Sequence, residues 1–439
     1  MEALDPARLC FDRDPEPLAL QDLQPVRRLR ICLLGYRSHP YGGGQGVYLR
    51  YLSKALHDLG HQVDVISGQP YPHLEPGVRL IPMPGMNLYE NGLLSLRPRH
   101  LVSLSNVIEW LSKLTGGFAE PQVFGRRVLK YLRAHRDAYD IVHDNQSLGY
   151  ALLDLQRMGI PLITTIHHPI TSDLRIALAA CSWWWPRLLT RRWHSFLGMQ
   201  KRVARELEHV VTVSECSRHD IARDFGVPAA RLVVVPNGVD TEVFSPSTAS
   251  VRKPLQLMVT ASADQPLKGL AVLLRAFAML LPSHPGLRLL MIGRPRPGGD
   301  TERLIARLGL GPHIDCEAGI ATTELVRHYR ESTVVVVPSL YEGFGLPAVE
   351  AMACGAALVS SDGGALAEVV GAGGVLVAAG DASALAAAIS ALLADPARRV
   401  ELGRRARERI LERFCWRRAA RQMTAYYQQV LAQHGNGGS

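Results

Sequence analysis

A short segment in the second half of the chain constrains the fold more than any other part of the sequence. Its apolar run over residues 333–338 has the composition of a strand buried on both faces of a parallel sheet. Glu342, a Gly-Phe-Gly turn and Pro347 follow, and then an alanine-rich stretch typical of a helix. Proline is favoured at the first helical position, because its missing N–H group would have no partner there. The segment predicts a strand, a tight loop carrying Glu342 and a helix carrying Glu350 in its first turns.

This loop is suited to a phosphorylated, hydroxyl-rich ligand. The first N–H groups of a helix have no partner within it, and the helix dipole adds partial positive charge, so an anion is stabilised there. In open parallel sheets, ligands bind beyond the carboxyl ends of the strands. Glu342 and Glu350 would flank such a ligand and accept hydrogen bonds from its hydroxyl groups.

Strand-like and helix-like segments alternate along the chain, which predicts parallel sheets joined by crossover helices. The expected strands of a first unit are 29–35, 62–67, 79–83, 141–143, 162–167, 210–214 and 232–239, and those of a second are 255–260, 287–292, 313–317, 333–337, 357–360 and 375–377. A chain of 439 residues is too long for one ordinary core. We therefore expect an α/β protein with two Rossmann-like, doubly wound domains that face one another across a cleft.

The domain boundaries follow from changes in composition. We expect a flexible leader over residues 1–27, a first domain over 28–243, a second over 255–415, a helix over 416–433 and a disordered tail over 434–439. A stretch rich in proline, serine and threonine joins the two domains.

Composition excludes several classes of protein. Hydrophobic residues make up 47% of the chain and charged residues 20%, which is typical of a globular protein and not of a disordered one. The seven cysteines are scattered, so a disulfide framework or a zinc site is not expected, and a reducing cytoplasm is the predicted compartment. No apolar run approaches the roughly 20 residues of a membrane span, and no signal peptide is recognisable at the start.

Glu342 and Glu350, with Gly-Phe-Gly-Leu-Pro between them, resemble the E-x7-E element of the retaining family 4 glycosyltransferases, in the glycogen-synthase-like group. Matching pieces occur in the same order over residues 42–368. The resemblance implies the GT-B fold, with a last helix, residues 416–433, that crosses back onto the first domain. It also implies transfer of a hexosyl group from a nucleotide diphosphate sugar to an acceptor hydroxyl of a lipid or a glycan precursor. The anomeric configuration would be retained, without a bound metal or cofactor.

The resemblance implies roles for the residues of this loop. Glu342 would accept hydrogen bonds from hydroxyls of the donor sugar and orient it for catalysis. The backbone N–H groups of Phe344, Gly345 and Leu346 would face the sugar and its diphosphate. Glu350 would accept from the two ribose hydroxyls; taken alone, it would be an acid that complements a helix N-terminus.

Lys268 follows the first expected strand of the second unit. A lysine at the carboxyl end of a strand places a compact positive charge where it would stabilise a departing diphosphate. The family usually has an arginine shortly before this lysine, and this chain has Ser262 there. Either Arg294 supplies the second charge, or Lys268 and backbone amides act without one.

His167 ends an apolar strand and matches the family histidine that contacts the donor sugar near its 6-position. His168 and His143 are weaker candidates, because a histidine at a strand end is often only a hydrogen-bonded structural residue. In the family, the glycine-rich turn that contains Gly43 and Gly44 closes over the donor phosphate. Its pattern does not match a dinucleotide-binding fingerprint.

Two further loops match the family. Glu368 lies in a Gly-Gly-x-x-Glu loop that would pack under the nucleotide, and a structural role at a helix start is an equal alternative. The family reads the edge of the base with backbone groups at the position of Gly319. Backbone contacts leave little mark on a sequence, so the base stays unassigned.

Residues 176–203 contain no acidic side chain, five basic ones and a cluster of aromatics, namely Trp183, Trp184, Trp185, Trp193 and Phe196. Tryptophan favours the headgroup level of a bilayer, and arginine is attracted to anionic lipid. Helical spacing places Arg187, Arg191 and Arg202 near one face. A second basic cluster consists of Arg126, Arg127, Lys130 and Arg133.

These features predict peripheral binding of residues 183–202 to an anionic surface on the inner face of the membrane. The alternative is an ordinary domain interface with buried tryptophans and a solvated basic face. Nucleic acid is disfavoured as a partner, because no recognition fold accompanies the basic residues.

Three other functions are compatible with the same sequence features. A GT-B epimerase or phosphorylase shares the two-domain fold, and would act on the donor alone or require inorganic phosphate. A catalytically silent subunit that binds a nucleotide sugar or a membrane is favoured only by Ser262. The presence of Glu342, Lys268 and Glu350 together counts against it.

Overall fold

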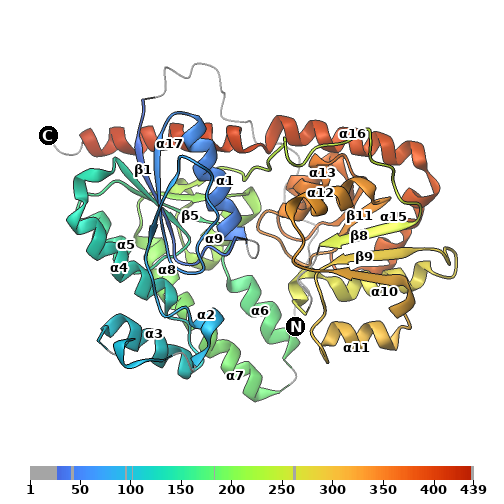
Figure 1. Ribbon diagram of the computed structural model, residues 1–439, viewed down its shortest axis with the longest axis horizontal. Coiled ribbons are helices and arrows are strands. Elements are labelled where there is room, and N and C mark those ends of the chain that lie inside the picture. Colours follow the sequence, from blue (N-terminus) through green and yellow to red (C-terminus); the bar gives the residue numbers. More distant parts are fainter. Residues whose placement is uncertain are drawn as a thin grey trace.

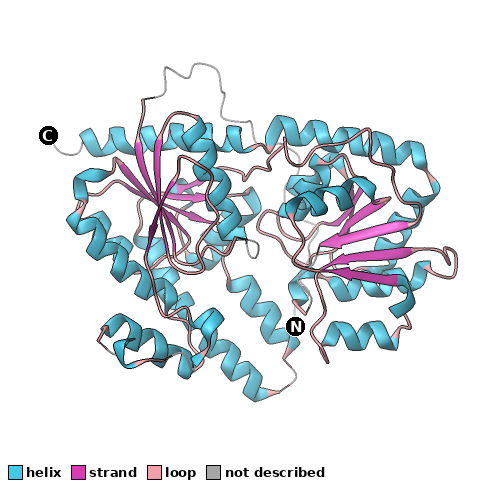
Figure 2. Ribbon diagram, in the orientation of Figure 1, coloured by secondary structure: helices cyan, strands magenta, loops and turns pink. Residues whose placement is uncertain are grey.

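The computed structural model describes residues 27–40, 44–93, 96–100, 102–181, 183–260 and 264–436. Within them the chain forms two parallel sheets flanked by helices, so the expected two-domain α/β fold is confirmed (Figure 1, Figure 2). The first sheet contains β1 (Arg30–Gly35), β2 (Gln62–Ser67), β3 (Arg79–Pro82), β4 (Ile141–Asn145), β5 (Leu162–Ile166), β6 (Val210–Thr212) and β7 (Leu232–Val234). The second contains β8 (Gln256–Thr260), β9 (Arg288–Ile292), β10 (Ile314–Glu317), β11 (Val334–Val337), β12 (Leu358–Ser361) and β13 (Val375–Val377).

Helices follow most of these strands. Those of the first domain are α1 (Gly44–Asp58), α2 (Leu88–Asn91), α3 (Leu104–Leu114), α4 (Glu120–Ala134), α5 (Ala151–Arg157), α6 (Thr171–Ala180), α7 (Trp184–Trp193), α8 (Leu197–Glu206) and α9 (Glu215–Phe225). The later ones are α10 (Leu270–Leu280), α11 (Asp300–Arg307), α12 (Thr322–Glu331), α13 (Leu346–Ala353), α14 (Leu366–Val370), α15 (Ala382–Ala394), α16 (Pro396–Arg413) and α17 (Trp416–Asn436).

Strand order shows where each sheet offers a binding site. The first sheet has the order β3-β2-β1-β4-β5-β6-β7, and the second has the order β10-β9-β8-β11-β12-β13. The direction of winding therefore reverses between β1 and β4, and between β8 and β11. Loops that leave the carboxyl ends of the strands at such a switch point diverge, and ligands of doubly wound proteins bind there.

Helices cover both faces of each sheet, which accounts for the apolar strands. In β1, Ile31 and Leu33 pack with α1 and α17, whereas Cys32 and Leu34 pack with helices on the opposite face. In the second domain, α10 and α15 cover one face, and α12, α13, α14 and α16 cover the other. Such strands are apolar throughout and do not alternate with polar residues.

All thirteen expected strands are present, and the differences lie at their ends. β5 ends at Ile166, so His167 lies in the loop that follows. β7 ends at Val234, five residues earlier than expected, because Pro236 has no N–H group to continue the ladder. β4 runs on to Asn145 and carries that side chain to the edge of the sheet.

The last helix crosses between the domains. α16 lies against the second domain, and α17 continues along the first, as Figure 1 shows. The Trp416 ring stacks on Tyr51 with 5.9 Å between the ring centres and meets Tyr48 edge-on. α17 reaches Asn436, so residues 434–436, expected in a disordered tail, are helical. The expected leader up to residue 26, and the tail from residue 437, lie outside the described residues.

Replacing Trp416 by alanine should therefore destabilise the protein. The side chain is only 6% exposed and joins α17 to α1, and removing a buried tryptophan costs about 3–5 kcal/mol. Urea unfolding measures the loss, with Trp185→Ala as a matched control, because Trp185 is 54% exposed. A loss at Trp416 no larger than that at Trp185 would contradict the packing described.

Candidate active site

An ion pair lies at the switch point of the second sheet. The Nζ atom of Lys268 lies 2.7 Å from Oε1 of Glu342, and the Ser339 hydroxyl donates to the same oxygen at 2.8 Å. Within the described part of the chain, Oε2 of Glu342 has no hydrogen-bond donor. The backbone of Glu342 is held at both ends, since its N–H bonds Gly363 and its carbonyl accepts from Ala365. One carboxylate oxygen is thus fixed, and the other is available to a ligand.

The position of Lys268 depends on a tight turn. Residues Pro266–Lys268 form one turn of 3-10 helix that ends at Gly269, whose φ is +64°. A Cβ atom at Gly269 would lie 1.8 Å from the Pro338 carbonyl oxygen, so only glycine fits. The Leu340 N–H also bonds the Leu267 carbonyl at 2.7 Å. The turn is therefore fastened to the end of β11, next to Glu342.

The N-terminus of α13 adds backbone donors beside this pair. Gly345 precedes the helix with φ of +97°, and Pro347 lies in the first turn. The N–H groups of Phe344, Gly345 and Leu346 donate to no other described residue. The Phe344 ring is buried against Phe414, so this residue offers a ligand its backbone and not its ring. An anion is stabilised at such a helix end.

Glu350 lies one turn into α13, and its side chain is unusual in its ionisation. Burial raises its pKa to about 7, against a hydrogen bond that opposes the rise. That bond comes from the Tyr329 hydroxyl, which donates to Oε2 at 2.9 Å. The carboxyl group therefore changes charge near neutral pH.

His167 is the contribution of the first domain. Its Nε2 lies 2.7 Å from Oδ1 of Asn145, and its backbone N–H donates to Oε1 of Gln146 at 2.7 Å. The ring meets Tyr48 edge-on, with 4.7 Å between centres. Burial, with a smaller effect of His168, lowers its pKa to about 3, so the ring is neutral at physiological pH.

The other two histidines are placed differently. His143 is buried, and its ring nitrogens lie 2.7 Å from the Tyr427 hydroxyl and 2.7 Å from that of Thr165, so it is a structural residue. His168 faces Asp173 at 3.5 Å. Asn145 and Gln146 were not among the sequence-predicted residues. Their signal was their place at the end of β4, the strand that neighbours β1 at the switch point: Asn145 is its last residue and Gln146 follows directly.

The two domains touch at Gly343. Its carbonyl oxygen lies 2.8 Å from the Ser214 hydroxyl and 3.1 Å from that of Ser217, which also lies 2.8 Å from the His167 carbonyl. A Cβ atom at Gly343 would lie 2.9 Å from the His167 carbonyl oxygen and 2.9 Å from Cβ of His168. A glycine is needed for this approach, which brings the Glu342 loop against His167.

Glu368 caps a helix of the opposite domain. Its carboxylate accepts from the N–H groups of Glu215 and Cys216, at the start of α9. Burial raises its pKa, and these hydrogen bonds oppose the rise. The structural alternative for Glu368 fits this geometry, since a carboxylate stabilises the positive end of a helix.

Other predicted residues lie around this centre. A Cβ atom at Gly44 would lie 3.7 Å from the Leu346 side chain, so the glycine turn meets the start of α13. Arg294 is exposed after β9 and forms no hydrogen bond or ion pair with another described residue. Gly319, with φ of +69°, is exposed after β10. Gly43 and Ser262 lie outside the described residues.

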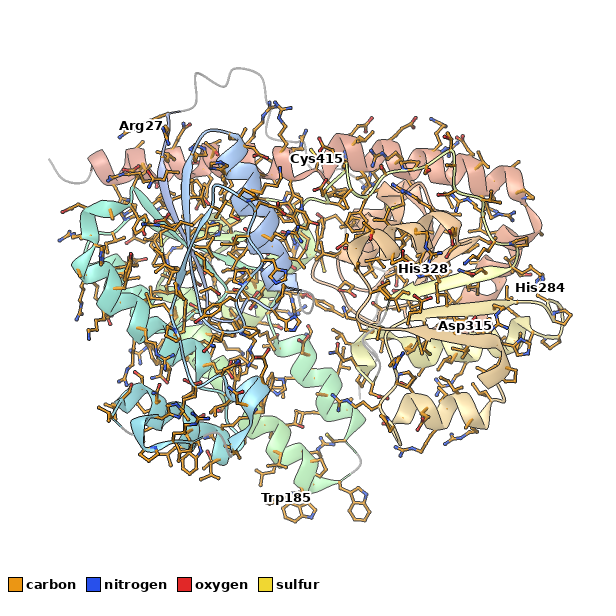
Figure 3. All side chains as sticks on the ribbon, viewed as in Figure 1. Arg27, Trp185, His284, Asp315, His328 and Cys415 are labelled. Carbon is orange, nitrogen blue, oxygen red and sulfur yellow. The ribbon has the colours of Figure 1, made fainter. Side chains whose placement is uncertain are left out.

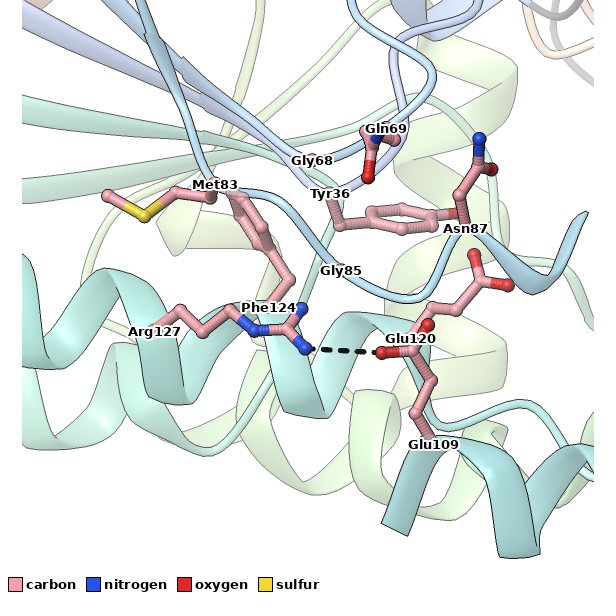
Figure 4. Close-up of a pocket in the computed structure, with 10 residues that line it drawn as sticks. All are labelled: Tyr36, Gly68, Gln69, Met83, Gly85, Asn87, Glu109, Glu120, Phe124 and Arg127. Atoms are coloured by element: carbon pink, nitrogen blue, oxygen red, sulfur yellow. Dashed lines mark hydrogen bonds and ion pairs between the residues drawn. The ribbon is translucent and has the colours of Figure 1, made fainter. Parts of the chain in front are cut away.

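A separate cavity lies beyond the carboxyl ends of β1, β2 and β3 (Figure 4). It is lined by Tyr36, Gln69, Asn87, Glu109, Glu120 and Arg127, among others. Arg127 pairs with the buried Glu109 at 3.3 Å, and Arg37 pairs with Glu120. Its solvent-accessible volume of about 20 Å³ is enough for about one ordered water molecule. The Lys268–Glu342 pair lies at the switch point of the second sheet, where ligands of doubly wound proteins bind, and is the better candidate for the reaction centre.

The tryptophan-rich segment is exposed and not an internal interface. Trp183, Trp184 and Trp185 are 74%, 70% and 54% exposed, and Trp185 points away from the body in Figure 3. Trp183 precedes α7, which begins with Trp184 and Trp185 and has no buried residue. Arg192 of α7 donates to the hydroxyl of Thr115, the residue that follows α3, at 2.8 Å. Buried tryptophans, the alternative expectation, are thus wrong.

Two details of the predicted basic surface are also wrong. Arg202 belongs to α8, where it pairs with Glu206, because a 3-10 turn over His194–Phe196 interrupts the helix after α7. Arg127 faces Glu109 and not solvent. Among the described residues, no helix is long and apolar enough to cross a membrane, and no three acidic, histidine or cysteine side chains are grouped as metal ligands.

Known proteins resemble this chain over nearly its whole length. Residues 42–243 match the model of Glycosyltransferase Family 4, and residues 244–409 match that of Glycosyl transferases group 1. The MMP alpha-(1->4)-mannosyltransferase of Mycolicibacterium hassiacum is 44% identical over 92% of this chain and 99% of that protein. The D-inositol 3-phosphate glycosyltransferase 2 of Catenulispora acidiphila is 30% identical over 92% of this chain and 95% of that protein.

Solved structures share the architecture. Sucrose-phosphate synthase from Thermosynechococcus elongatus aligns with a TM-score of 0.70 at 25% identity, over 92% of this chain and all of that one. WaaG, at 14% identity over 90% of this chain and 99% of that one, has a TM-score of 0.67 and shares the fold. The two-domain arrangement is GT-B, and the chain belongs to the family 4 glycosyltransferases.

Proposed function

We propose that this glycosyltransferase moves a mannosyl group from a nucleotide diphosphate sugar to the 4-hydroxyl of a glycan or lipid-linked acceptor, with retention and without a metal. The Lys268–Glu342 pair at the switch point carries the proposal, since it unites a cation for diphosphate with a carboxylate for sugar hydroxyls. The sugar and the linkage rest on the mannosyltransferase that shares 44% identity with the chain.

Catalysis would be mainly electrostatic. As the bond between the anomeric carbon and the diphosphate breaks, negative charge grows on the leaving oxygen, where Lys268 and the amides of Gly345 and Leu346 stabilise it. Glu342 accepts from a sugar hydroxyl with its free oxygen and orients the ring. Arg294 would supply further positive charge if the loops close around the diphosphate.

Retention follows if the acceptor hydroxyl attacks the face from which the diphosphate departs. The new carbon–oxygen bond forms there, and the acceptor proton passes to the departing diphosphate oxygen. No side chain is assigned as a nucleophile. Contact between the domains at Gly343 would exclude water, so transfer is favoured over hydrolysis of the donor.

Replacing Glu342 by glutamine should lower kcat on the order of 10²-fold, since a group aimed at the reacting sugar is lost. The assay follows nucleoside diphosphate release from UDP-, GDP- and ADP-sugars, with and without acceptor, in EDTA. Glu324→Gln, on the exposed face of α12, is the matched control. The anomeric configuration of the product is read from its carbon–hydrogen coupling.

Unchanged turnover of Glu342→Gln would overturn the assignment of this centre. Donor binding without release by the unmodified protein would indicate a silent subunit. Conversion of the donor alone would indicate an epimerase, and a requirement for inorganic phosphate would indicate a phosphorylase.

Glu350 should make donor binding depend on pH. Its pKa of about 7 means that the carboxyl is protonated below neutrality, and ionised, able to accept both ribose hydroxyls, above it. Donor KM should therefore rise by up to about tenfold per pH unit as pH falls below 7. The pH dependence of donor KM should vanish in Glu350→Gln. If the pH dependence persists in that variant, it must come from another ionisable group.

We also propose that the enzyme is cytoplasmic and binds the inner face of the membrane through a tryptophan surface, defined as Trp183, Trp184, Trp185, Leu188 and Leu189 with Arg187 and Arg191. All seven side chains are exposed on or beside α7, which carries no acidic residue. The apolar members suit the acyl boundary, and the arginines suit anionic headgroups.

Removing both charges, with Arg187→Gln and Arg191→Gln, should weaken binding to phosphatidylglycerol vesicles by about 2 kcal/mol, or about 30-fold. Vesicle sedimentation measures the change. Arg307→Gln with Arg417→Gln removes two exposed charges elsewhere and should have no effect. Equal binding to phosphatidylcholine and phosphatidylglycerol vesicles, or none to either, would contradict the proposal.

A further inference from the structure

Asn145 and Gln146 are buried polar residues that the mechanism above does not use. They are 1% and 3% exposed, at the carboxyl end of β4. Both side chains are directed at the loop that carries His167. A buried amide with fixed partners determines which of those partners donates and which accepts.

The orientation of the Asn145 amide follows from its first partner. Its Nδ2 lies 3.1 Å from the backbone carbonyl oxygen of Gln45, in the first turn of α1. A carbonyl oxygen only accepts hydrogen bonds, so the amide nitrogen must face it. The amide oxygen, Oδ1, is then the atom that lies 2.7 Å from Nε2 of His167.

The tautomer of His167 follows in turn. Oδ1 of Asn145 only accepts, so Nε2 must carry a proton. A neutral imidazole carries one proton, and the low pKa of His167 keeps the ring neutral. Nδ1 is therefore a bare acceptor. It bonds no described residue, and it is not among the fully buried polar atoms that lack a partner, so it keeps some exposure to solvent.

Gln146 holds the same loop by its backbone. Its Oε1 accepts from the His167 N–H at 2.7 Å, and its Nε2 donates to the His168 carbonyl at 2.9 Å. Asp144 stiffens the turn, accepting from the Ser147 N–H and from the Thr164 hydroxyl. The imidazole is thus fixed in position as well as in protonation.

We propose that Asn145 is a positioning residue that holds His167 in its Nε2–H tautomer, so that Nδ1 accepts a hydrogen bond from a hydroxyl of the transferred sugar. The proposal rests on the proposed transfer of a hexosyl group. It also ties the glycine turn to the same amide, because the Gln45 carbonyl and the His167 ring share Asn145.

The tautomer is tested without any reaction. In the full-length protein with ¹⁵N-labelled histidine, long-range ¹H–¹⁵N spectra should show His167 with a protonated Nε2 and an unprotonated Nδ1. Asn145→Ala should release this preference, while Asn106→Ala, which removes a half-buried amide bonded to Arg127, should not. A protonated Nδ1 in the unmodified protein would overturn the proposal, whatever the activity.

Kinetics test the link to the sugar. Asn145→Ala should lower kcat/KM about tenfold, the loss of one hydrogen bond's positioning. If Asn145 acts through His167, it should cost nothing further in a His167→Ala background. Equal losses in both backgrounds would assign Asn145 a merely structural role. The protein could also show the expected tautomer and yet turn over no donor. That result would support the positioning role of Asn145 but contradict the proposed function and the sugar contact.

Asn145→Asp should change the pH dependence of activity, which a merely structural role of Asn145 would leave unchanged. The ionisable groups facing His167 are His168 in its own loop, His143 on β4 and Tyr48 on α1, and none of them carries a negative charge at neutral pH. A carboxylate at 145 should raise the pKa of His167, because its negative charge favours the charged imidazolium. Below that pKa the ring is charged and Nδ1 no longer accepts. At saturating donor, where the effect of Glu350 on donor KM no longer matters, kcat should therefore gain an acidic limb that Asn106→Asp lacks. A kcat profile unchanged from that control would contradict the proposal.

Discussion

The backbone carbonyl of Gly343 is the contact on which the rest of the candidate site depends. Two serine hydroxyls of the first domain, from Ser214 and Ser217, lie within hydrogen-bonding distance of it. Glu368 of the second domain makes a contact in the other direction, since its carboxylate caps α9, and those serines lie at the start of that helix. The site is thus assembled from two domains. Their joint combines neutral groups with two carboxylates, those of Glu368 and Asp220, which accept hydrogen bonds from the opposite domain.

The charged side chains of the site all lie in one domain. Lys268, Glu342 and Glu350 all belong to the second domain, and the first pair neutralise one another at 2.7 Å. The first domain contributes a neutral imidazole and the amides that fix it. A diphosphate bound as proposed would find its partners on one side only. The sugar would then lie between the charged side and the neutral one, with its hydroxyls facing a carboxylate from one domain and a bare nitrogen from the other.

Most of the architecture was predictable, because strands buried on both faces are apolar without interruption and the turns between them contain glycine and proline. Glu342, Lys268 and Glu350 were predictable for a related reason, since each follows a strand or opens a helix. Asn145 and Gln146 were not, because their importance lies in contacts with residues 100 and 22 positions away, which only the strand order creates. The Arg202 error arose likewise, from a break in the helix that the arginine spacing did not reveal.

The tautomer of His167 limits which ligand groups can face the ring. The backbone carbonyl of Gln45 can only accept a hydrogen bond, which fixes the orientation of the Asn145 amide. That orientation in turn fixes which nitrogen of the His167 ring carries the proton. The nitrogen presented to the ligand must accept, so the ligand must donate, and a hydroxyl does so whereas a carboxylate repels the lone pair. The free carboxylate oxygen of Glu342, in the opposite domain, likewise requires a ligand group that donates a hydrogen bond. If both groups face the ligand as proposed, a ligand between them must offer hydroxyl groups on two sides, as a neutral hexose does.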